Sequence, residues 1–221
     1  MQRLIVISSS ATALMTTTLM SAVISAQSTN AVRLQIAPGS QLSFEGTSTL
    51  HGFTCTTKTM QAYVDVDPAY RTADLTTLTH PIIAVQVVIP VKSLACGGEL
   101  ENNMFKTLNA TKYPYIIYTL LNYDVVSGSA SATGFAADTH GRLTISGKEN
   151  AIAMRVDATR NAEGTVSARG EQAIKMSDFG VKPPTFMLGT LRVGNELKVR
   201  FTLKATPGAV ATAITQLGGN R

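Results

Sequence analysis

Apolar and polar residues alternate along most of the chain with a period of two, which is typical of β-strands that bury one face. The alternation is clearest near the C-terminus. There, the apolar residues that share one face are Val193, Leu197, Val199, Phe201 and Leu203. The same pattern occurs at residues 41–49, 82–91 and 152–157. Because successive side chains of a strand point to opposite faces, we predict that each of these segments is a half-buried strand.

Short sequences rich in Gly, Asn, Ser and Asp separate these strands. Ser127-Gly128 and the segment from Asn161 to Gly164 are typical of hairpin loops. Residues 138–141 are predicted to form another turn, between two short strands. Strands joined by short turns pair antiparallel, and about eight of them favour one up-and-down barrel over two small domains. We therefore predict an all-β fold, an extended antiparallel β-barrel.

One segment has the spacing of a helix instead. Leu100, Met104, Phe105 and Leu108 lie three and four residues apart, so they are predicted to share one face of a short amphipathic helix. Pro114 then ends any helix, because proline lacks an amide hydrogen and pushes the preceding residue towards extended geometry. A single helix in a mostly β chain predicts a closed sheet with a capping helix.

The N-terminus has the layout of a secretory signal peptide. It has Arg3, then an apolar stretch, then a run rich in Ser, Thr and Ala, and no acidic residue before Glu45. The preferred cleavage site follows Ala26, with Ala31 as the second choice, and an uncleaved membrane anchor is disfavoured by the many Ser and Thr residues. The predicted divisions are a signal peptide (1–26), a lead-in (27–40), the barrel (41–205) and a flexible tail (206–221). We expect a periplasmic or secreted protein.

The formal net charge of +5 does not indicate a nucleic-acid surface. The Lys and Arg residues are scattered through the strands and are not clustered with aromatic residues, so we expect no nucleic-acid partner. The excess of positive charge is compatible with transient contact with anionic lipid headgroups. The oligomeric state is left open between a monomer and a homodimer.

Cys55 and Cys96 are the two cysteines of the chain. An exported protein meets oxidising conditions, so we predict a disulfide between them, the alternative being two separate buried thiols. His51, His80 and His140 lie in separate predicted turns, without the spacing of metal ligands. No metal or other cofactor is expected.

Three sequences that resemble catalytic motifs each lack an essential part. Ser48 precedes His51, but no glycine pattern of a nucleophile elbow surrounds the serine. Asp178-Phe179-Gly180 has no accompanying catalytic loop of a kinase. The segment from Gly141 to Lys148 is one residue too long for a phosphate-binding loop. We therefore expect a protein without catalytic activity.

Four segments, taken together, resemble the YceI-like polyisoprenoid-binding family, which is lipocalin-like in shape. They are Leu100-x3-Met104-Phe105-x2-Leu108-x4-Tyr113-Pro114-x-Ile116-x-Tyr118, Gly141-Arg-Leu143-Thr144-Ile145-x-Gly147, Met176-Ser-Asp178-Phe179-Gly180 and Val193-Gly-Asn-Glu-Leu197-x-Val199. Each is weak alone, but the four follow the order and spacing of the family over residues 41–205. Ser146 stands where the family often has His, and Cys96 to Gly98 replace a link that is commonly rich in Ser and Thr.

The resemblance implies a barrel capped by the helix, with an apolar tunnel that holds a polyisoprenoid or another long-chain lipid. The side chains expected to line the tunnel are Phe44, Val85, Val87, Ile89, Met104, Phe105, Ile116, Tyr118, Leu143, Ile145, Met154, Phe179, Phe201 and Leu203. The alternative is that these residues fill the barrel completely. A filled barrel would fit an extracytoplasmic stress-response or protein-interaction module.

The predicted disulfide is tested by thiol titration of the denatured, unreduced protein. We expect no free sulfhydryl, and two after reduction, because Cys55 and Cys96 are the only cysteines. Two reactive thiols before reduction would show that the cysteines are not bonded to each other.

Overall fold

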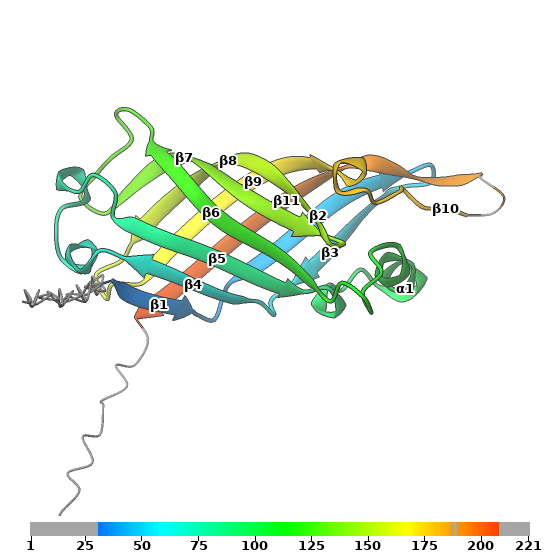
Figure 1. Ribbon diagram of the computed structural model, residues 1–221, viewed down its shortest axis with the longest axis horizontal. Coiled ribbons are helices and arrows are strands. Elements are labelled where there is room, and N and C mark those ends of the chain that lie inside the picture. The colour runs from blue at the N-terminus through cyan, green and yellow to red at the C-terminus, as the bar shows by residue number, and fades with distance from the viewer. Residues whose placement is uncertain (1–30, 187, 189, 208–221) are drawn as a thin grey trace, which may run out of the picture.

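The computed structural model describes residues 31–186, 188 and 190–207, and the chain in this region is mostly β-sheet (Figure 1). The strands are β1 (Val32–Ile36), β2 (Gln41–Ser48), β3 (Gly52–Thr57), β4 (Gln61–Val66), β5 (Ile82–Pro90), β6 (Tyr115–Val125), β7 (Gly134–Ile145), β8 (Lys148–Arg160), β9 (Val166–Lys175), β10 (Thr185–Phe186) and β11 (Leu191–Pro207). The helix α1 spans Gly98–Thr107. Short 3-10 helices are η1 (Pro68–Arg71), η2 (Leu75–Thr77), η3 (Val91–Ser93) and η4 (Met176–Phe179). The predicted signal peptide and most of the predicted tail lie outside the described residues.

Eight strands form a closed antiparallel barrel. Their order around the barrel is β1-β4-β5-β6-β7-β8-β9-β11, and pairing of β1 with β11 closes the ring. Strands β2 and β3 extend the sheet from β11, and β10 also pairs with β11. This arrangement confirms the predicted all-β barrel with one helix.

The long strand β11 joins the parts of the barrel. One of its edges pairs with β9 from Glu196 to Ala205. The other edge pairs first with β2 and then, at its C-terminal end, with β1. Ser40 fixes the corner between β1 and β2, because its hydroxyl donates to the carbonyl of Ala37 at 2.8 Å and accepts from the amide of Lys204 at 2.9 Å.

Three local features differ from the sequence-based expectations. Strand β1 lies within the predicted lead-in. The predicted turn at 138–141 is wrong, because β7 continues through these residues and Asp138 forms an ion pair with Arg155 of β8 at 2.9 Å. The alternation over residues 82–91 predicts that Ile83 shares a face with Val85 and Val87, and this is also wrong. An irregularity in the register of β4 and β5 turns Ile82 inward and leaves Ile83 half exposed.

The buried side chains form three clusters. One lies around η1 and η2 and contains Leu34, Tyr70 and Phe135. A second, containing Ile145 and Phe179, packs against Leu108, the C-cap residue of α1. A third is centred on Met60, Val87 and Ile89. The barrel is therefore packed in separate regions and not through one continuous core.

Charged side chains on the outer face of the barrel pair across neighbouring strands. Arg200 of β11 contacts Glu45 of β2 and Glu171 of β9, and Lys198 contacts Glu171 at 2.7 Å. Hydrogen bonds from Lys198 and Arg200 lower the pKa of the Glu171 carboxyl. Within the described part of the chain, no helix is long and apolar enough to cross a membrane.

A close contact at the start of β7 gives a test of the packing. A Cβ on Gly134 would lie 2.7 Å from the carbonyl oxygen of Ala158, a backbone atom that cannot swing away. We expect Gly134→Ala to lower the free energy of unfolding by about 1–3 kcal/mol, measured by urea denaturation. The control is Gly52→Ala, because the atom nearest to the added Cβ would be 3.6 Å away. Equal stability of the two variants would contradict the packing of β7 on β8.

Candidate ligand-binding site

The interior of the barrel contains an apolar cavity of about 280 Å³. It reaches from Ala158 and Val166, beside the η1 and η2 end, to Leu100 and Met104 of α1. Seven of the eight barrel strands, all but β1, contribute side chains, as do β2, β3 and α1. The interior is therefore not completely filled by side chains, and the alternative of a solid barrel does not hold.

The alternation of residues along each strand explains the chemistry of the wall. On β11, Val199, Phe201 and Leu203 line the cavity, whereas Lys198 and Arg200 form ion pairs outside. The other strands repeat this arrangement, because a pleated strand sends alternate side chains to opposite faces. Within the described residues, no Asp, Glu, Lys, Arg or His lines the cavity.

The structure brings together thirteen of the fourteen residues that the sequence analysis placed in the tunnel. They are Phe44, Val85, Val87, Ile89, Met104, Ile116, Tyr118, Leu143, Ile145, Met154, Phe179, Phe201 and Leu203. Their contact with a ligand stays a prediction.

Phe105 is the residue that does not line the cavity. The helix positions that do are Leu100, Asn103, Met104, Thr107 and Leu108, which recur at the three- and four-residue spacing of one helical face. Phe105 follows Met104 by one residue and is therefore rotated by about 100° from it around the helix axis. The polar Asn103 and Thr107 occupy the face instead.

Several lining residues were not identified from the sequence. Phe53 and Gln172 occupy inward positions of their strands and could have been found from the alternation alone. Tyr123 could not. A register shift between Leu120 and Asn122 reverses the alternation of β6, so that Leu121 is exposed and Tyr123 turns inward.

Aromatic rings lie against glycines of the wall. A Cβ on Gly141 would be 2.5 Å from the ring of Tyr118, and one on Gly170 would be 2.6 Å from the ring of Phe201. Phe201 and Gly170 are directly opposite each other on β11 and β9. A side chain on either glycine would displace the facing ring, so the glycines allow the rings to lie close to the sheet.

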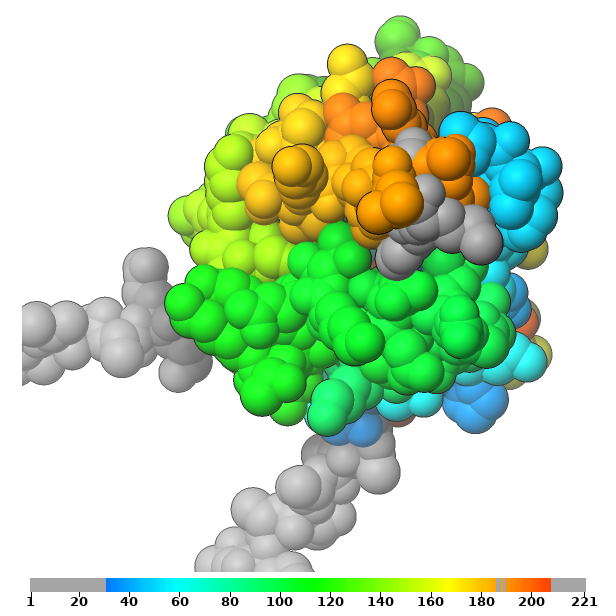
Figure 2. All heavy atoms as spheres, turned by 90° about the vertical axis from the view of Figure 1, so that its right-hand side faces the viewer, coloured from blue at the N-terminus to red at the C-terminus, as the bar shows by residue number. Residues whose placement is uncertain are grey.

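Helix α1 lies across one end of the barrel. Figure 2 views this end and shows α1, in green, over one half, and the segment from η4 to the start of β11, in gold and orange, over the other. No residue of α1 is fully buried. Gly97 and Gly98, which lead into the helix, both have positive φ angles of 82° and 56°. Helix α1 therefore covers this end of the barrel without being buried itself, and the connection that leads into it contains two glycines.

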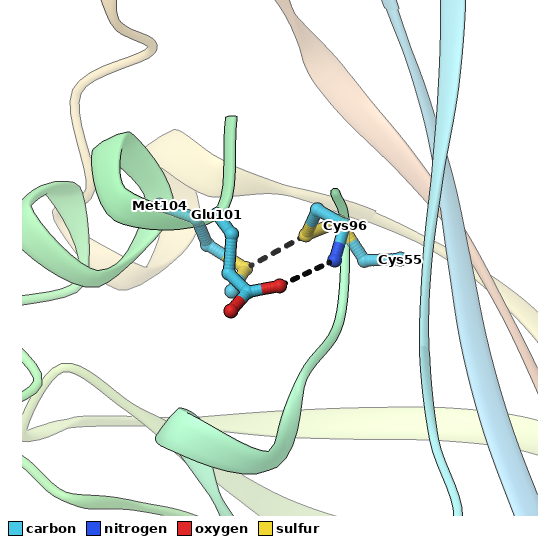
Figure 3. Close-up of a disulfide and its surroundings, with 4 residues drawn as sticks. All are labelled: Cys55, Cys96, Glu101 and Met104. Carbon is cyan, nitrogen blue, oxygen red and sulfur yellow. Dashed lines mark hydrogen bonds between the residues drawn. A yellow bond between two sulfur atoms is a disulfide. The ribbon is translucent and has the colours of Figure 1, made fainter. Parts of the chain in front are cut away.

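A disulfide connects this cover to the barrel wall (Figure 3). Cys55 of β3 is bonded to Cys96, with the two Cα atoms 4.2 Å apart, which confirms the predicted pairing. The amide of Cys96 donates to the carboxylate of Glu101 at 3.2 Å, and its sulfur lies 3.5 Å from the sulfur of Met104. At the other end of α1, the Ser146 hydroxyl donates to the carbonyl of Leu108 at 3.0 Å. These contacts attach both ends of α1 to the rest of the protein.

The opposite end of the barrel is closed by packed side chains around Tyr70. Tyr70 is 1 % exposed, and its hydroxyl has no hydrogen-bond partner within the part of the chain that the structure describes. Burial raises the pKa of Tyr70 to about 12, although the nearby positive charge of Arg160 opposes this effect. Next to it, the Tyr123 hydroxyl accepts a hydrogen bond from the amide of Ile82 at 3.0 Å.

Ser48, His51 and His80 contact backbone carbonyls or an aromatic ring. The Ser48 hydroxyl donates to the backbone carbonyl of His51 at 2.8 Å, so this bond does not use the imidazole. The His51 ring contacts the carbonyl of Gly52, and His80 packs edge-on against Tyr123. No group of three His, Cys, Asp or Glu residues in the described ranges is arranged to hold a metal ion.

Comparisons with known proteins agree with this architecture. A family model described as a YceI-like domain matches residues 28–205. Among solved structures, BcnA of Burkholderia cenocepacia is similar with a TM-score of 0.59 and 24% identity, over 76% of this chain and 96% of that chain. A polyisoprenoid binding domain from Saccharophagus degradans, implicated in plant cell wall breakdown, has a TM-score of 0.59 and 17% identity, over 80% and 99% of the two chains. The YCEI protein of Campylobacter jejuni has a TM-score of 0.52 and 18% identity, over 70% and 85%. None of the curated proteins compared with the chain matches it.

The buried phenol of Tyr70 predicts a loss of stability at high pH. An unfolded tyrosine ionises near pH 10, whereas Tyr70 in the fold keeps its proton to about pH 12. Between these values only the unfolded state releases this proton, so the free energy of unfolding falls by about 1.4 kcal/mol per pH unit from this residue. Urea denaturation at pH 8 and pH 11 should show a smaller loss for Tyr70→Phe than for the unchanged protein.

At neutral pH, Tyr70→Phe should be at least as stable as the unchanged protein, because the hydroxyl that it removes has no partner. An identical dependence on pH in both proteins would show that Tyr70 is not shielded from water.

Proposed function

Since this chain belongs to the YceI-like domain family, we propose that it is an exported binding protein without catalytic activity. Its ligand is a polyisoprenoid or a similar long-chain lipid, held in the cavity of the barrel. The observation that carries the proposal is the cavity itself, which is apolar, continuous and without a charged residue in its described lining. The similarity to a polyisoprenoid binding domain supports the choice of ligand class.

The hydrophobic effect is large enough for such a ligand. Burial of one CH₂ group contributes about 0.8 kcal/mol, so a five-carbon isoprene unit contributes up to about 3 kcal/mol. Four units contribute up to about 12 kcal/mol, and an association cost of about 4 kcal/mol leaves roughly −8 kcal/mol, which corresponds to micromolar binding. The cavity of about 280 Å³ is close to the lower end of the range of ligand pockets, about 300–1,000 Å³.

Export and contact with membranes complete the proposal. The signal-peptide pattern before Ala26 supports a periplasmic or secreted location, and the disulfide between Cys55 and Cys96 is typical of proteins in oxidising compartments. A lipid carrier has to meet a membrane to load or release its ligand, so we include transient contact with lipid headgroups in the proposal.

Displacement of a fluorescent hydrophobic probe tests the function. The probe should become fluorescent inside the cavity, and prenyl alcohols should displace it. Ala168→Phe places a ring inside the cavity and should weaken probe binding by about tenfold or more, because it removes apolar space.

The matched control is Ala173→Phe, which adds the same ring to the exposed face of the same strand. It should bind the probe as the unchanged protein does. Absence of probe binding by the unchanged protein, or equal loss in both variants, would contradict a lipid site in the barrel.

A further inference from the structure

Gln172 is a polar residue on the inner face of β9. Its neighbours in sequence, Glu171 and Ala173, are exposed, and Glu171 forms ion pairs with Lys198 and Arg200 outside the barrel. Gln172 itself lines the cavity, directly opposite Val199 of β11. The other side chains of β9 at the cavity wall are apolar, so the amide of Gln172 is the polar group that this strand contributes to the described lining.

The nitrogen of the Gln172 amide already makes a hydrogen bond within the protein. Its nitrogen Nε2 donates to the backbone carbonyl of Ala173 at 3.0 Å. This bond fixes the orientation of the amide group, since only the nitrogen can donate. The oxygen Oε1 has no hydrogen-bond partner among the described residues. Gln172 is half-buried, so Oε1 stays accessible and can accept a hydrogen bond from a donor on a ligand.

Two other polar groups of the wall are occupied within the protein. The Thr139 hydroxyl donates to the carbonyl of Met154 at 2.9 Å, and the Tyr123 hydroxyl accepts from the amide of Ile82. Burial raises the pKa of Tyr118, although a hydrogen bond with Thr139 opposes this effect. The polar contribution of the wall is thus small and consists of neutral groups.

The wall also lacks the groups that bind phosphate. Phosphate sites in proteins use Arg or Lys side chains, or several convergent backbone amides. On β11, Lys198 and Arg200 flank the inward Val199, and both point outward and are paired with acids. Moving a phosphate into a cavity without a cation is strongly unfavourable, because its hydration is lost without compensation.

We propose that the cavity selects a lipid whose polar end is an uncharged hydroxyl group, that this hydroxyl donates to Oε1 of Gln172, and that prenyl phosphates are excluded. This selectivity rests on the proposed function and names the chemistry of the ligand within it. The lack of charged side chains in the described lining and the unused acceptor of Gln172 are two separate observations that lead to it.

Three compounds with the same carbon chain test the selectivity. They are geranylgeraniol, geranylgeranyl phosphate and the corresponding hydrocarbon, each used to displace the fluorescent probe from the unchanged protein. We expect the alcohol to bind on the order of 100-fold more tightly than the phosphate. Gln172→Met keeps the length of the side chain but removes the acceptor. It should weaken binding of the alcohol by about 5- to 10-fold and leave binding of the hydrocarbon unchanged.

Two further variants complete the test. Gln61→Leu removes a glutamine from an exposed position of β4 and should bind all three compounds as the unchanged protein does. Gln172→Glu keeps an acceptor and adds a negative charge. Its affinity for the alcohol should be unchanged, and its affinity for the phosphate should be still lower than that of the unchanged protein. It also provides a second variant if Gln172→Met does not fold.

The outcomes separate the selectivity from the function. Binding of the phosphate as tight as that of the alcohol would overturn the selectivity and leave a lipid-binding barrel. If Gln172→Met weakened binding of the alcohol and of the hydrocarbon to the same extent, or left binding of both unchanged, the role of Gln172 would be overturned. Failure of all three compounds to displace the probe would count against the proposed function itself.

Discussion

The cavity depends on closure of the sheet through β11. An open sheet of this size would expose two hydrogen-bonding edges and could not enclose a space. Strand β11 closes the ring of eight strands, because it pairs with β9 on one side and with β2 and then β1 on the other. The turn at Ser40 makes the change of partner on that second edge, and its hydroxyl bonds both the turn and β11. The barrel is therefore held by one strand of 17 residues.

Closure separates two chemical environments. The outer face carries ion pairs such as Arg200 with Glu171, which remain in water and are therefore weak. The inner face carries apolar side chains and a few neutral polar groups. Successive side chains of a strand point to opposite faces. The alternation that places charged side chains on the outer face therefore also keeps them out of the interior. The selectivity proposed for Gln172 follows from this separation.

Much of the fold follows from local patterns in the sequence. Strands such as β8 and β11 are predictable because their inward residues, for example Met154 and Phe201, recur at every second position. The turn expected at 138–141 was wrong because residues typical of turns also occur where a strand gains something else from them. Asp138 gains an ion pair with Arg155, and Gly141 leaves room for the Tyr118 ring.

Other features depend on distant parts of the chain and could not be predicted. The inward position of Tyr123 and the outward position of Ile83 follow from irregularities in pairing, which involve two strands at once. Whether the barrel is hollow is also invisible in the alternation, since a filled barrel has the same pattern. The close approach of the Phe201 ring to the opposing Gly170 is likewise a contact between two strands that the pattern of one strand does not contain.

The position of β11 along the chain has a consequence for biosynthesis. It follows every strand with which it pairs, so the growing polypeptide has no enclosed interior until almost all of the described residues have been made. During synthesis the earlier strands can form only an open sheet. Its apolar face is then exposed, which promotes aggregation. For the proposed lipid ligand, this order implies that binding follows completion of the barrel.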